Sequence, residues 1–181
     1  MNDDQRALSD ITMLDLCDEK GQLMGKLMGD MGARVIKIEP PSGARARSIG
    51  PFLNDEDDPE YSLYFWANNT SKESITLNLE SEGGQSIFRQ LASKANVVLE
   101  SFDPGYLSSL GLDYASLSAD NPELIMTSLT GFGQDGPYGT RAGVDQIVQG
   151  MSGLMSVTGE PGRGPMRVGV AISDTSAGMF L

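Results

Sequence analysis

Short apolar runs alternate along the chain with segments in which apolar residues recur at helical spacing. The first run, ITMLDLC at 11–17, is followed by GQLMGKLMGDMG at 21–32 and then by RVIKIEP at 34–40. This order predicts a strand, an amphipathic helix ended by Gly32, and a second strand. Further strand-like runs lie at 73–79, 96–102 and 123–133.

Helical patterns fill most of the intervals between these runs. Ser81 is a candidate N-cap for a helix that carries Ile87, Phe88 and Leu91 on one side. Strands that alternate with helices at this spacing predict a Rossmann-like α/β fold, with a mainly parallel sheet and flanking helices. Other helical segments are expected at 104–111, 114–117 and 142–156, and a last one begins near 174.

Two segments stand apart from this alternation. PSGARARSIGPFLNDEDDPEYS at 41–62 is a long polar loop, and loops of this length in compact domains are often functional. The stretch MRVGVAIS at 166–173 is short, apolar and strand-like, and DTSAGMFL after it is typical of a helix start without a stop signal. We therefore expect residues 1–10 to be a polar tail and 11–181 to be the N-terminal part of a longer protein.

The composition narrows the chemistry that the chain can perform. The 181 residues include no histidine and one cysteine, which excludes Ser-His-Asp catalysis, His-ligated metal sites and an internal disulfide. The net charge of −12, from 13 basic and 25 acidic residues, argues against nucleic-acid binding. Neither a secretory signal nor a membrane-length apolar run is present in the sequence. A cytoplasmic protein is expected, whose nucleophilic or acid–base chemistry falls to Asp, Glu, Lys, Tyr or Cys17.

Several segments are candidates for ligand contacts, and each also has a purely structural interpretation. The first predicted turn, LCDEKGQLMG, lacks the GxGxxG pattern, so it is either an anion site or an ordinary connection. GFGQDGPYG at 131–139 offers backbone amides to a ligand or is simply a turn. Lys72 and a basic cluster in an otherwise acidic chain either meet phosphates or lie on a solvated surface. The cluster consists of Arg34, Lys37, Arg45 and Arg47.

Three further residues are open to a structural and a chemical interpretation. Cys17 has no histidine to activate it and stands in a strand, which favours a buried small residue over a nucleophile. Asp145 in AGVDQIVQ is interpreted as helix surface or as a cap. Asp174 stands at the predicted helix start, where it is either an N-cap or an ionised carboxylate able to attack an electrophile.

Longer segments, taken in order, carry a resemblance to a known family. They are MLDLCDEKGQLMGKLMGDMGARVIKIEPPSG, IGPF, YFWANNTSKESITLNLESEGGQSIF, NVVLESFDPGYLSSLGLDYASLSADNPELIMTSLTGFGQDGPYG, AGVDQIVQGMSGLMSVTGEP and ISDTSAGM. Together they resemble the class III CoA-transferase family, also called the CaiB–BaiF family, from about residue 11 to 181. Family chains are considerably longer, so the resemblance implies a missing smaller domain and a Gly-rich loop that closes over the active site.

The resemblance implies covalent chemistry at Asp174, in ISDTSAGM. In this chemistry the aspartate attacks the thioester carbonyl of an acyl-CoA, and a mixed anhydride and CoA thiolate result. The thiolate then attacks the aspartyl carbonyl to give an enzyme–CoA thioester, and an acceptor carboxylic acid takes over the CoA by the reverse sequence. A carboxylate is a competent covalent nucleophile, and amides at a helix start suit the tetrahedral intermediates. Coenzyme A is thus expected as a substrate, with no permanently bound cofactor and no metal.

The resemblance also implies contacts with CoA. Ser101 and Phe102 occupy the positions of a family Asn-Phe pair, and Asp103 and Ser109 depart from the family pattern as well. These departures leave the adenine and phosphate contacts open. The expected contacts are Asp18, Glu19 and Lys20 in the first turn, then Arg47, Lys72, Ser101 and Phe102, with Arg141 near the acyl or pantetheine end.

Two alternatives to a transferase are considered. Acyl-CoA racemases of the same family carry a histidine where this chain has Val144. A single carboxylate at Asp174 cannot serve both faces of an α-carbon, so the absence of histidine favours the transferase. The second alternative is a non-catalytic fragment that binds CoA weakly. Family members form intertwined homodimers, so a homodimer acting on an acyl-CoA and a small carboxylic acid is implied, with neither nucleic acid nor membrane as a partner.

Overall fold

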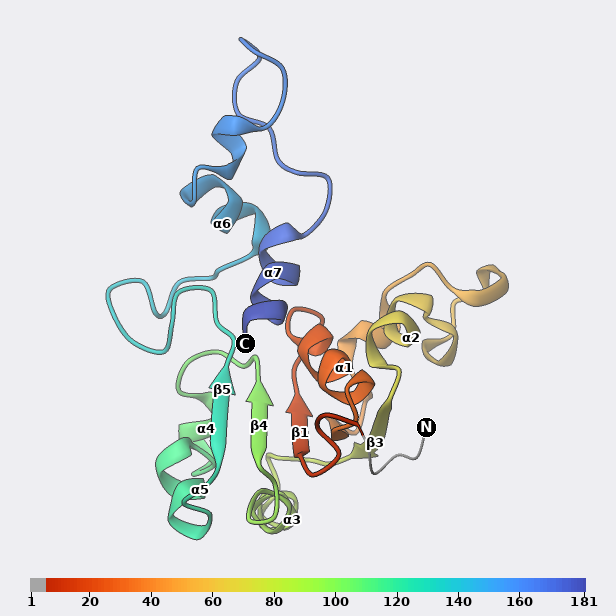
Figure 1. Cartoon of the computed structure of the whole chain (residues 1–181), viewed down its shortest axis with the longest axis vertical. Coiled ribbons are helices and arrows are strands. Elements are labelled where there is room, and N and C mark those ends of the chain that lie inside the picture. Colours follow the sequence, from red (N-terminus) through yellow and green to blue (C-terminus); the bar gives the residue numbers. More distant parts are fainter. Residues whose placement is uncertain (1–5) are drawn as a thin grey trace.

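The computed structural model describes residues 6–181 and contains a five-stranded sheet flanked by helices (Figure 1). β1 (Thr12–Leu16) lies at the centre, and the strands follow the order β3-β2-β1-β4-β5. All neighbouring strands are parallel, so the α/β fold expected from the sequence is confirmed. The remaining strands of this sheet are β2 (Arg34–Glu39), β3 (Lys72–Thr76), β4 (Val97–Glu100) and β5 (Ile125–Ser128).

Helices connect the strands and cover both faces of the sheet. Within residues 6–181 they are α1 (Gln22–Asp30), α2 (Leu63–Asn69), α3 (Glu82–Ala92), α4 (Tyr106–Ser109), α5 (Tyr114–Asp120), α6 (Asp145–Met151) and α7 (Ile172–Phe180). Gly32 follows α1 with a φ of +109°, which confirms the predicted helix end. The Ser81 hydroxyl accepts a hydrogen bond from the Gly84 amide at 3.1 Å, which confirms the predicted cap of α3.

The central strands send alternate side chains into two cores, one on each face of the sheet. Leu14 and its neighbours in the alternation face the larger core, which α3 completes with Phe88. Met13 faces the opposite core, against Met24 and Met28 of α1. This alternation follows from the two-residue period of a strand, and burial on both faces is what a parallel sheet covered by helices requires.

A charged cluster lies within the α1 side of the sheet. Asp15 has no exposed surface, and the parallel register places Lys37 directly beside it. The Lys37 ammonium lies 3.4 Å from one carboxylate oxygen of Asp15, and the Lys72 ammonium lies 2.7 Å from the other. Both lysine side chains are at most 2% exposed, so the solvated-surface interpretation is wrong for them.

Lys72 is fully occupied within the chain. Besides Asp15, its ammonium donates to the carbonyl oxygen of Gln22 at 2.7 Å and to Oδ1 of Asn69 at 2.8 Å. Burial lowers the pKa of Lys72, and the negative charge of Asp15 opposes this effect. The cluster thereby connects β1, β3, α1 and α2.

Helix α1 can approach this cluster because it carries a glycine at the point of contact. A Cβ atom at Gly25 would lie 2.5 Å from Oδ2 of Asp15. Any larger residue there would push α1 away from the sheet. The same helix presents the Gln22 carbonyl to Lys72, so the position of its first turn depends on both contacts.

The structure differs from the sequence pattern near its C-terminal end and in the long loop. Residues 165–171 form no strand, and the helix begins at Ile172 rather than near 174. The Val168 amide bonds to a side-chain oxygen of Gln149 at 2.8 Å instead of to a neighbouring strand. Helix α2 follows the long loop and was not predicted, although Ser62 caps it by accepting from the Phe65 amide at 3.0 Å.

The expected polar tail falls partly outside the described residues, which exclude 1–5. Within the described part of it, the Leu8 amide donates to the Met31 carbonyl at 3.2 Å, and the Leu8 side chain packs against the core on the α1 side. In the part of the chain that the structure describes, no helix has both the length and the apolar character needed to cross a membrane.

The substitution Asp15→Asn tests the importance of the buried cluster. It leaves two buried ammonium groups without a compensating charge, so we expect the free energy of unfolding to fall by about 3–5 kcal/mol. Urea denaturation followed by circular dichroism measures this change. Glu73→Gln is the control, because it removes an ion pair with Arg34 that is more than half exposed and screened by solvent. An equal effect of the two substitutions would contradict the prediction.

Candidate active site

A pocket of about 460 Å³ opens where β1, β4 and β5 end. From β1 the chain adds β2 and β3 on one side of the sheet and then crosses to the other side to add β4 and β5. The boundary between β1 and β4 is therefore a topological switch point, where open α/β sheets bind ligands. Figure 1 shows α7, which forms one wall, above the carboxyl ends of these two strands. Of the residues predicted from the sequence, the pocket brings together Lys20, Ser101, Phe102, Arg141 and Asp174.

The turns after β1 and β4 are joined through Ser101. Its hydroxyl accepts from the Asp18 amide at 2.8 Å and donates to Oδ1 of Asp18 at 3.0 Å. The other carboxylate oxygen of Asp18 lies 3.3 Å from the Lys20 ammonium. Asp18 therefore holds Lys20 at the wall of the pocket and ties it to the end of β4.

Asp174 is the third residue of α7, and Ala171 is the N-cap, so the N-cap interpretation of Asp174 is wrong. Its side chain is free for another role and lines the pocket while half-buried. Burial raises the pKa of Asp174, and the negative charge of Asp145 raises it further, whereas Lys20 lowers it. Increased basicity makes a carboxylate a stronger nucleophile, whereas a position at the start of a helix favours its ionised form.

Asp145 holds the first turn of α7 in place. One of its carboxylate oxygens accepts from the Ser173 amide at 2.8 Å, and the other accepts from the Gln149 side chain at 2.6 Å. It is the first residue of α6, so the sequence interpretation as a simple cap or surface residue misses its contact with α7. This contact brings its charge close to Asp174.

Gln149 has no exposed surface and connects α6 to the segment that leads into α7. Its side-chain nitrogen donates to Asp145 and, at 3.2 Å, to the Val170 carbonyl, while its side-chain oxygen accepts from the Val168 amide at 2.8 Å. Sequence reasoning missed this residue. Asp145 and Gln149 of α6 both hold the start of α7, so the position of Asp174 depends on both helices.

A second pocket of about 490 Å³ shares Phe102 with the first. The Phe102 ring packs against Tyr106 with 4.7 Å between ring centroids. Asp18 and Arg45 line this pocket, and Arg45 pairs with Glu19 at 2.8 Å while 77% exposed. Cys17 lies beside it, 3% exposed, and burial raises the pKa of its thiol, which confirms the prediction of a buried small residue.

Arg47 contributes to neither pocket lining. Its guanidinium makes a two-pronged ion pair with Glu39, at 2.7 and 2.9 Å, and lies 3.9 Å from the centroid of the Phe65 ring. Burial alone would raise the pKa of Glu39, but hydrogen bonds from Arg47, Ser74 and the Ala44 amide outweigh it and lower the pKa to about 2. The predicted contacts of Arg47 and Lys72 with CoA therefore compete with filled bonds inside the chain.

The Gly-rich loop between β5 and α6 also contributes to the lining of this pocket. Gly131 and Gly143 lie in contact at its base, because a Cβ atom at either would come within 2.3 Å of the other's Cα. Both glycines line the pocket, as do Arg141 and Val144. The two ends of the loop therefore meet beside the pocket. The segment that the sequence identified as a turn cluster contributes to the pocket wall.

The arrangement supplies one basic carboxylate, Asp174, and two cationic side chains, Lys20 and Arg141, around one pocket. Such a set can form a covalent acyl bond and stabilise the oxyanion that precedes it. Among residues 6–181 no group of cysteine and acidic side chains lies close enough together to hold a metal ion.

Comparison with known proteins identifies the family of this chain. Residues 8–181 match the model of CoA-transferase family III, and the chain belongs to this family. It is 47% identical over 163 residues to a succinate–glutarate CoA-transferase of Agrobacterium fabrum and 46% identical over 157 residues to an acetyl-CoA:oxalate CoA-transferase of Acetobacter aceti. The crystal structure of a CAIB/BAIF family protein from Brucella suis superposes with a TM-score of 0.89 at 42% identity.

The matches cover most of this chain but less than half of each relative. The alignments take in 88% and 86% of the chain, and 41% and 39% of the Agrobacterium and Acetobacter proteins. The Brucella structure is covered to 47%, by 97% of this chain. The chain thus spans about two fifths of the length of the curated relatives it matches.

The charges around Asp174 predict opposite shifts in two variants. Asp145→Asn removes a negative neighbour and lowers the pKa of Asp174, whereas Lys20→Gln removes a positive neighbour and raises it. A carbon-13 NMR titration of aspartate side-chain carboxyl groups measures both. Shifts of the same sign in the two variants would contradict the electrostatic account.

Gln149→Leu tests how the start of α7 is held. It leaves the Val168 amide and the Val170 carbonyl without their partner, which costs about 1–3 kcal/mol locally. We expect hydrogen–deuterium exchange of the peptide 166–173 to accelerate about tenfold or more. Gln146→Leu is the matched control on the same helix, at an exposed position. Unchanged exchange in Gln149→Leu would show that the segment is held by other contacts.

Proposed function

We propose that this chain carries the nucleophile and the acyl-CoA pocket of a CoA-transferase, which moves CoA from an acyl-CoA to an acceptor carboxylic acid. The observation that carries the proposal is Asp174, a half-buried carboxylate of raised pKa in a pocket with Lys20 and Arg141. Membership of CoA-transferase family III and the similarity to two named CoA-transferases support this reaction class.

In the first half of the reaction, a carboxylate oxygen of Asp174 attacks the thioester carbonyl carbon. The carbon–sulfur bond breaks, CoA leaves as its thiolate, and a mixed anhydride joins Asp174 to the acyl group. The thiolate then attacks the aspartyl carbonyl carbon, and the acyl group leaves as a free carboxylate. The enzyme now holds CoA as an aspartyl thioester, so the energy of the original thioester is retained.

The second half runs the same steps in reverse with the acceptor acid. Its carboxylate attacks the aspartyl thioester and releases CoA thiolate, and a second mixed anhydride forms. The thiolate attacks the acceptor's carbonyl carbon in this anhydride, which yields the new acyl-CoA and frees Asp174. No net proton transfer occurs in any step, which suits a chain without histidine.

The two pockets fit the two ends of a CoA thioester. The reactive end belongs beside Asp174, where the positive charges of Lys20 and Arg141 line the same pocket and can stabilise oxyanions. The nucleotide end belongs in the second pocket, beside Asp18 and Arg45. Phe102 lines both pockets and would contact the pantetheine that connects them.

An acyl-CoA racemase is less well supported. Val144, the position at which racemases of this family carry a histidine, lines the pocket with an apolar side chain that cannot exchange a proton. Among the described residues that line this pocket, the carboxylates are Asp103 and Asp174.

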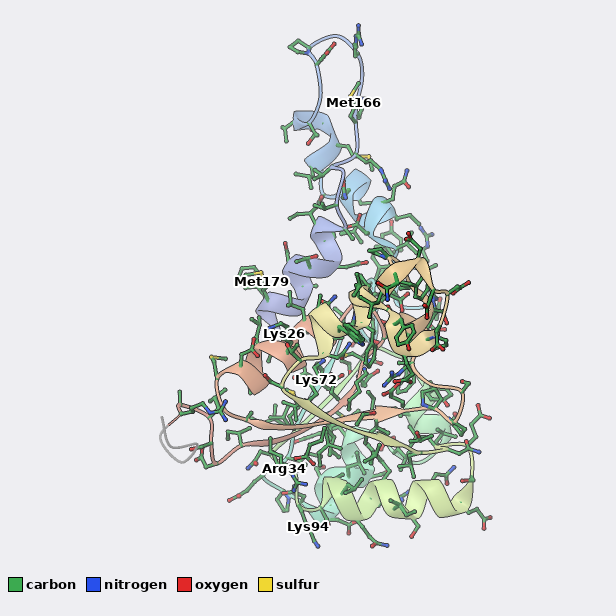
Figure 2. The ribbon with its side chains drawn as sticks, turned by 90° about the vertical axis from the view of Figure 1, so that its right-hand side faces the viewer. Lys26, Arg34, Lys72, Lys94, Met166 and Met179 are labelled. Carbon is green, nitrogen blue, oxygen red and sulfur yellow. The ribbon has the colours of Figure 1, made fainter. Side chains whose placement is uncertain are left out.

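Assembly as a homodimer belongs to the same proposal. At the end of α7, Met179 and Phe180 are 62% and 90% exposed, and Figure 2 shows Met179 pointing away from the body. Exposed apolar residues of this size are typical of surfaces that are covered in an assembly. A cytoplasmic location remains a prediction from the composition.

Trapping with hydroxylamine tests the covalent mechanism. The protein, in the longest form its gene encodes, is mixed with acetyl-, butyryl- or succinyl-CoA and hydroxylamine, and its peptides are analysed by mass spectrometry. We expect a hydroxamate on Asp174 with at least one donor, because hydroxylamine attacks the aspartyl carbonyl of the anhydride or thioester. Asp174→Asn should reduce CoA transfer by at least about a thousandfold.

A folded protein that binds CoA without forming the hydroxamate would contradict the aspartyl mechanism. Exchange of deuterium into the α-position of the acyl-CoA would then favour a racemase. Binding without either reaction would favour the non-catalytic alternative.

A further inference from the structure

A carboxylate is buried at the end of β4, beside the candidate active site. Glu100 is the last residue of this strand and is 3% exposed. Figure 1 shows the carboxyl end of β4 between those of β1 and β5, and Glu100 pairs in register with Leu16 on one side and with Ser128 on the other. It lines neither of the two pockets that the proposed function uses.

The two carboxylate oxygens of Glu100 bond to two separate segments of the chain. Oε2 accepts from the Phe102 amide at 2.7 Å, and Oε1 accepts from the side-chain amide of Gln134 at 3.2 Å. Phe102 is the residue whose side chain lines both pockets. Gln134 belongs to the loop whose ends meet at Gly131 and Gly143. Glu100 therefore joins the turn after β4 to this loop.

The bond from Glu100 to the Phe102 amide also holds the residue between them. Ser101 bonds through its hydroxyl to Asp18, in the turn after β1. If the bond at Glu100 loosens, two contacts of the turn are affected together: the place of Phe102 between the pockets and the connection through Ser101. Both lie where the proposed function places CoA.

No cation compensates the charge of Glu100. Within residues 6–181, no lysine or arginine lies within ion-pair distance of its carboxylate. The cavity of about 220 Å³ beside it is lined by two further acids, Asp103 and Asp113, and by Tyr114, and no basic side chain of the described residues lines it. Its surroundings therefore favour the neutral form of the carboxyl group.

Hydrogen bonds act against this tendency without cancelling it. Burial raises the pKa of Glu100, whereas hydrogen bonds from the Ser128 hydroxyl, the Phe102 amide and the Gln134 side chain lower it by less. Glu100 thus gains its proton at a higher pH than an exposed glutamate does. A neutral carboxyl group is a weaker acceptor for a backbone amide than a carboxylate is.

We propose that Glu100 is a positioning residue for CoA: its ionised carboxylate holds Phe102 between the two pockets, and the affinity for CoA falls when a proton neutralises it. This inference rests on the proposed function for the position of CoA. Because Glu100 lines neither pocket, it acts through the turn after β4 and not by touching CoA.

Glu100→Gln tests the proposal, because it removes the charge while keeping the size of the side chain. The dissociation constant of CoA is measured by isothermal titration calorimetry, with the protein in the longest form its gene encodes, at several pH values between about 5 and 8. We expect the variant to bind CoA about fivefold more weakly at the upper end of this range. The difference should shrink as the pH falls, since Glu100 of the unaltered protein then becomes neutral as well.

The chemical step provides a second measurement on the same variant. The rate of hydroxamate formation at Asp174 is followed with increasing succinyl-CoA. We expect the concentration at half-maximal rate to rise with the dissociation constant and the maximal rate to change less than about twofold, because Glu100 does not touch the reacting atoms.

Ser128→Ala tests the role of the charge without removing it. The substitution deletes a hydrogen bond that lowers the pKa of Glu100, so we expect the loss of CoA affinity to begin at a higher pH than in the unaltered protein. This test does not depend on whether Glu100→Gln folds. Glu123→Gln is the matched control, because it makes the same change in net charge at an exposed position that lines none of these cavities.

The outcomes separate this inference from the proposed function. Thermal unfolding at a lower temperature with unchanged CoA affinity in Glu100→Gln would show a purely structural role and overturn the inference. A loss of affinity that is the same at every pH, or a pH dependence that Ser128→Ala leaves unchanged, would overturn the role of the charge. If CoA binds but no donor gives a hydroxamate at Asp174, the proposed reaction fails while the affinities still test Glu100. An unaltered protein that binds no CoA would contradict both.

Discussion

The buried carboxylate of Asp15 between two lysines constrains the rest of this structure. An unpaired charge in the interior of a protein is very costly, so Lys37 and Lys72 must both reach the same carboxylate. That requirement fixes the register of β1, β2 and β3 and brings α1 close, with glycine at the contact point. The turn after β1 leads directly into α1 and contributes residues to both pockets. The walls of both pockets therefore depend on this charged cluster.

The candidate site is assembled from segments far apart in the sequence, each held by a specific polar contact. Ser101 ties the turn after β4 to the turn after β1. Asp145 and Gln149 tie α6 to the start of α7. The Asp145 side chain positions the start of α7 and also raises the pKa of Asp174. One residue therefore affects both the structure and the basicity of the site.

The sheet was predictable because strand-like apolar runs and helical segments alternate strongly along the chain. Several pocket residues, including Arg141, were named from the sequence only through a family resemblance. The pattern left Asp174 open between an N-cap and a reactive carboxylate, because it placed the helix start two residues too late.

Other parts could not be read from the pattern. Asp15 and Lys37 stand at corresponding positions of two apolar strands, a signal that could have predicted their pairing. Gln149 left no comparable signal, since its partners include backbone groups about twenty residues further along the chain. The segment before α7 was taken as strand-like because apolar residues predominate there, yet its Val168 amide bonds to the side chain of Gln149 and not to a strand.

The touching glycines at 131 and 143 also have a consequence for divergence within the family. A loop whose ends meet is a self-contained module, because its inner residues can change in type or number while the strand before it and the helix after it stay in place. Asp174 lies outside this module, on α7. Loop exchange can thus change this part of the pocket lining while Asp174 keeps its position.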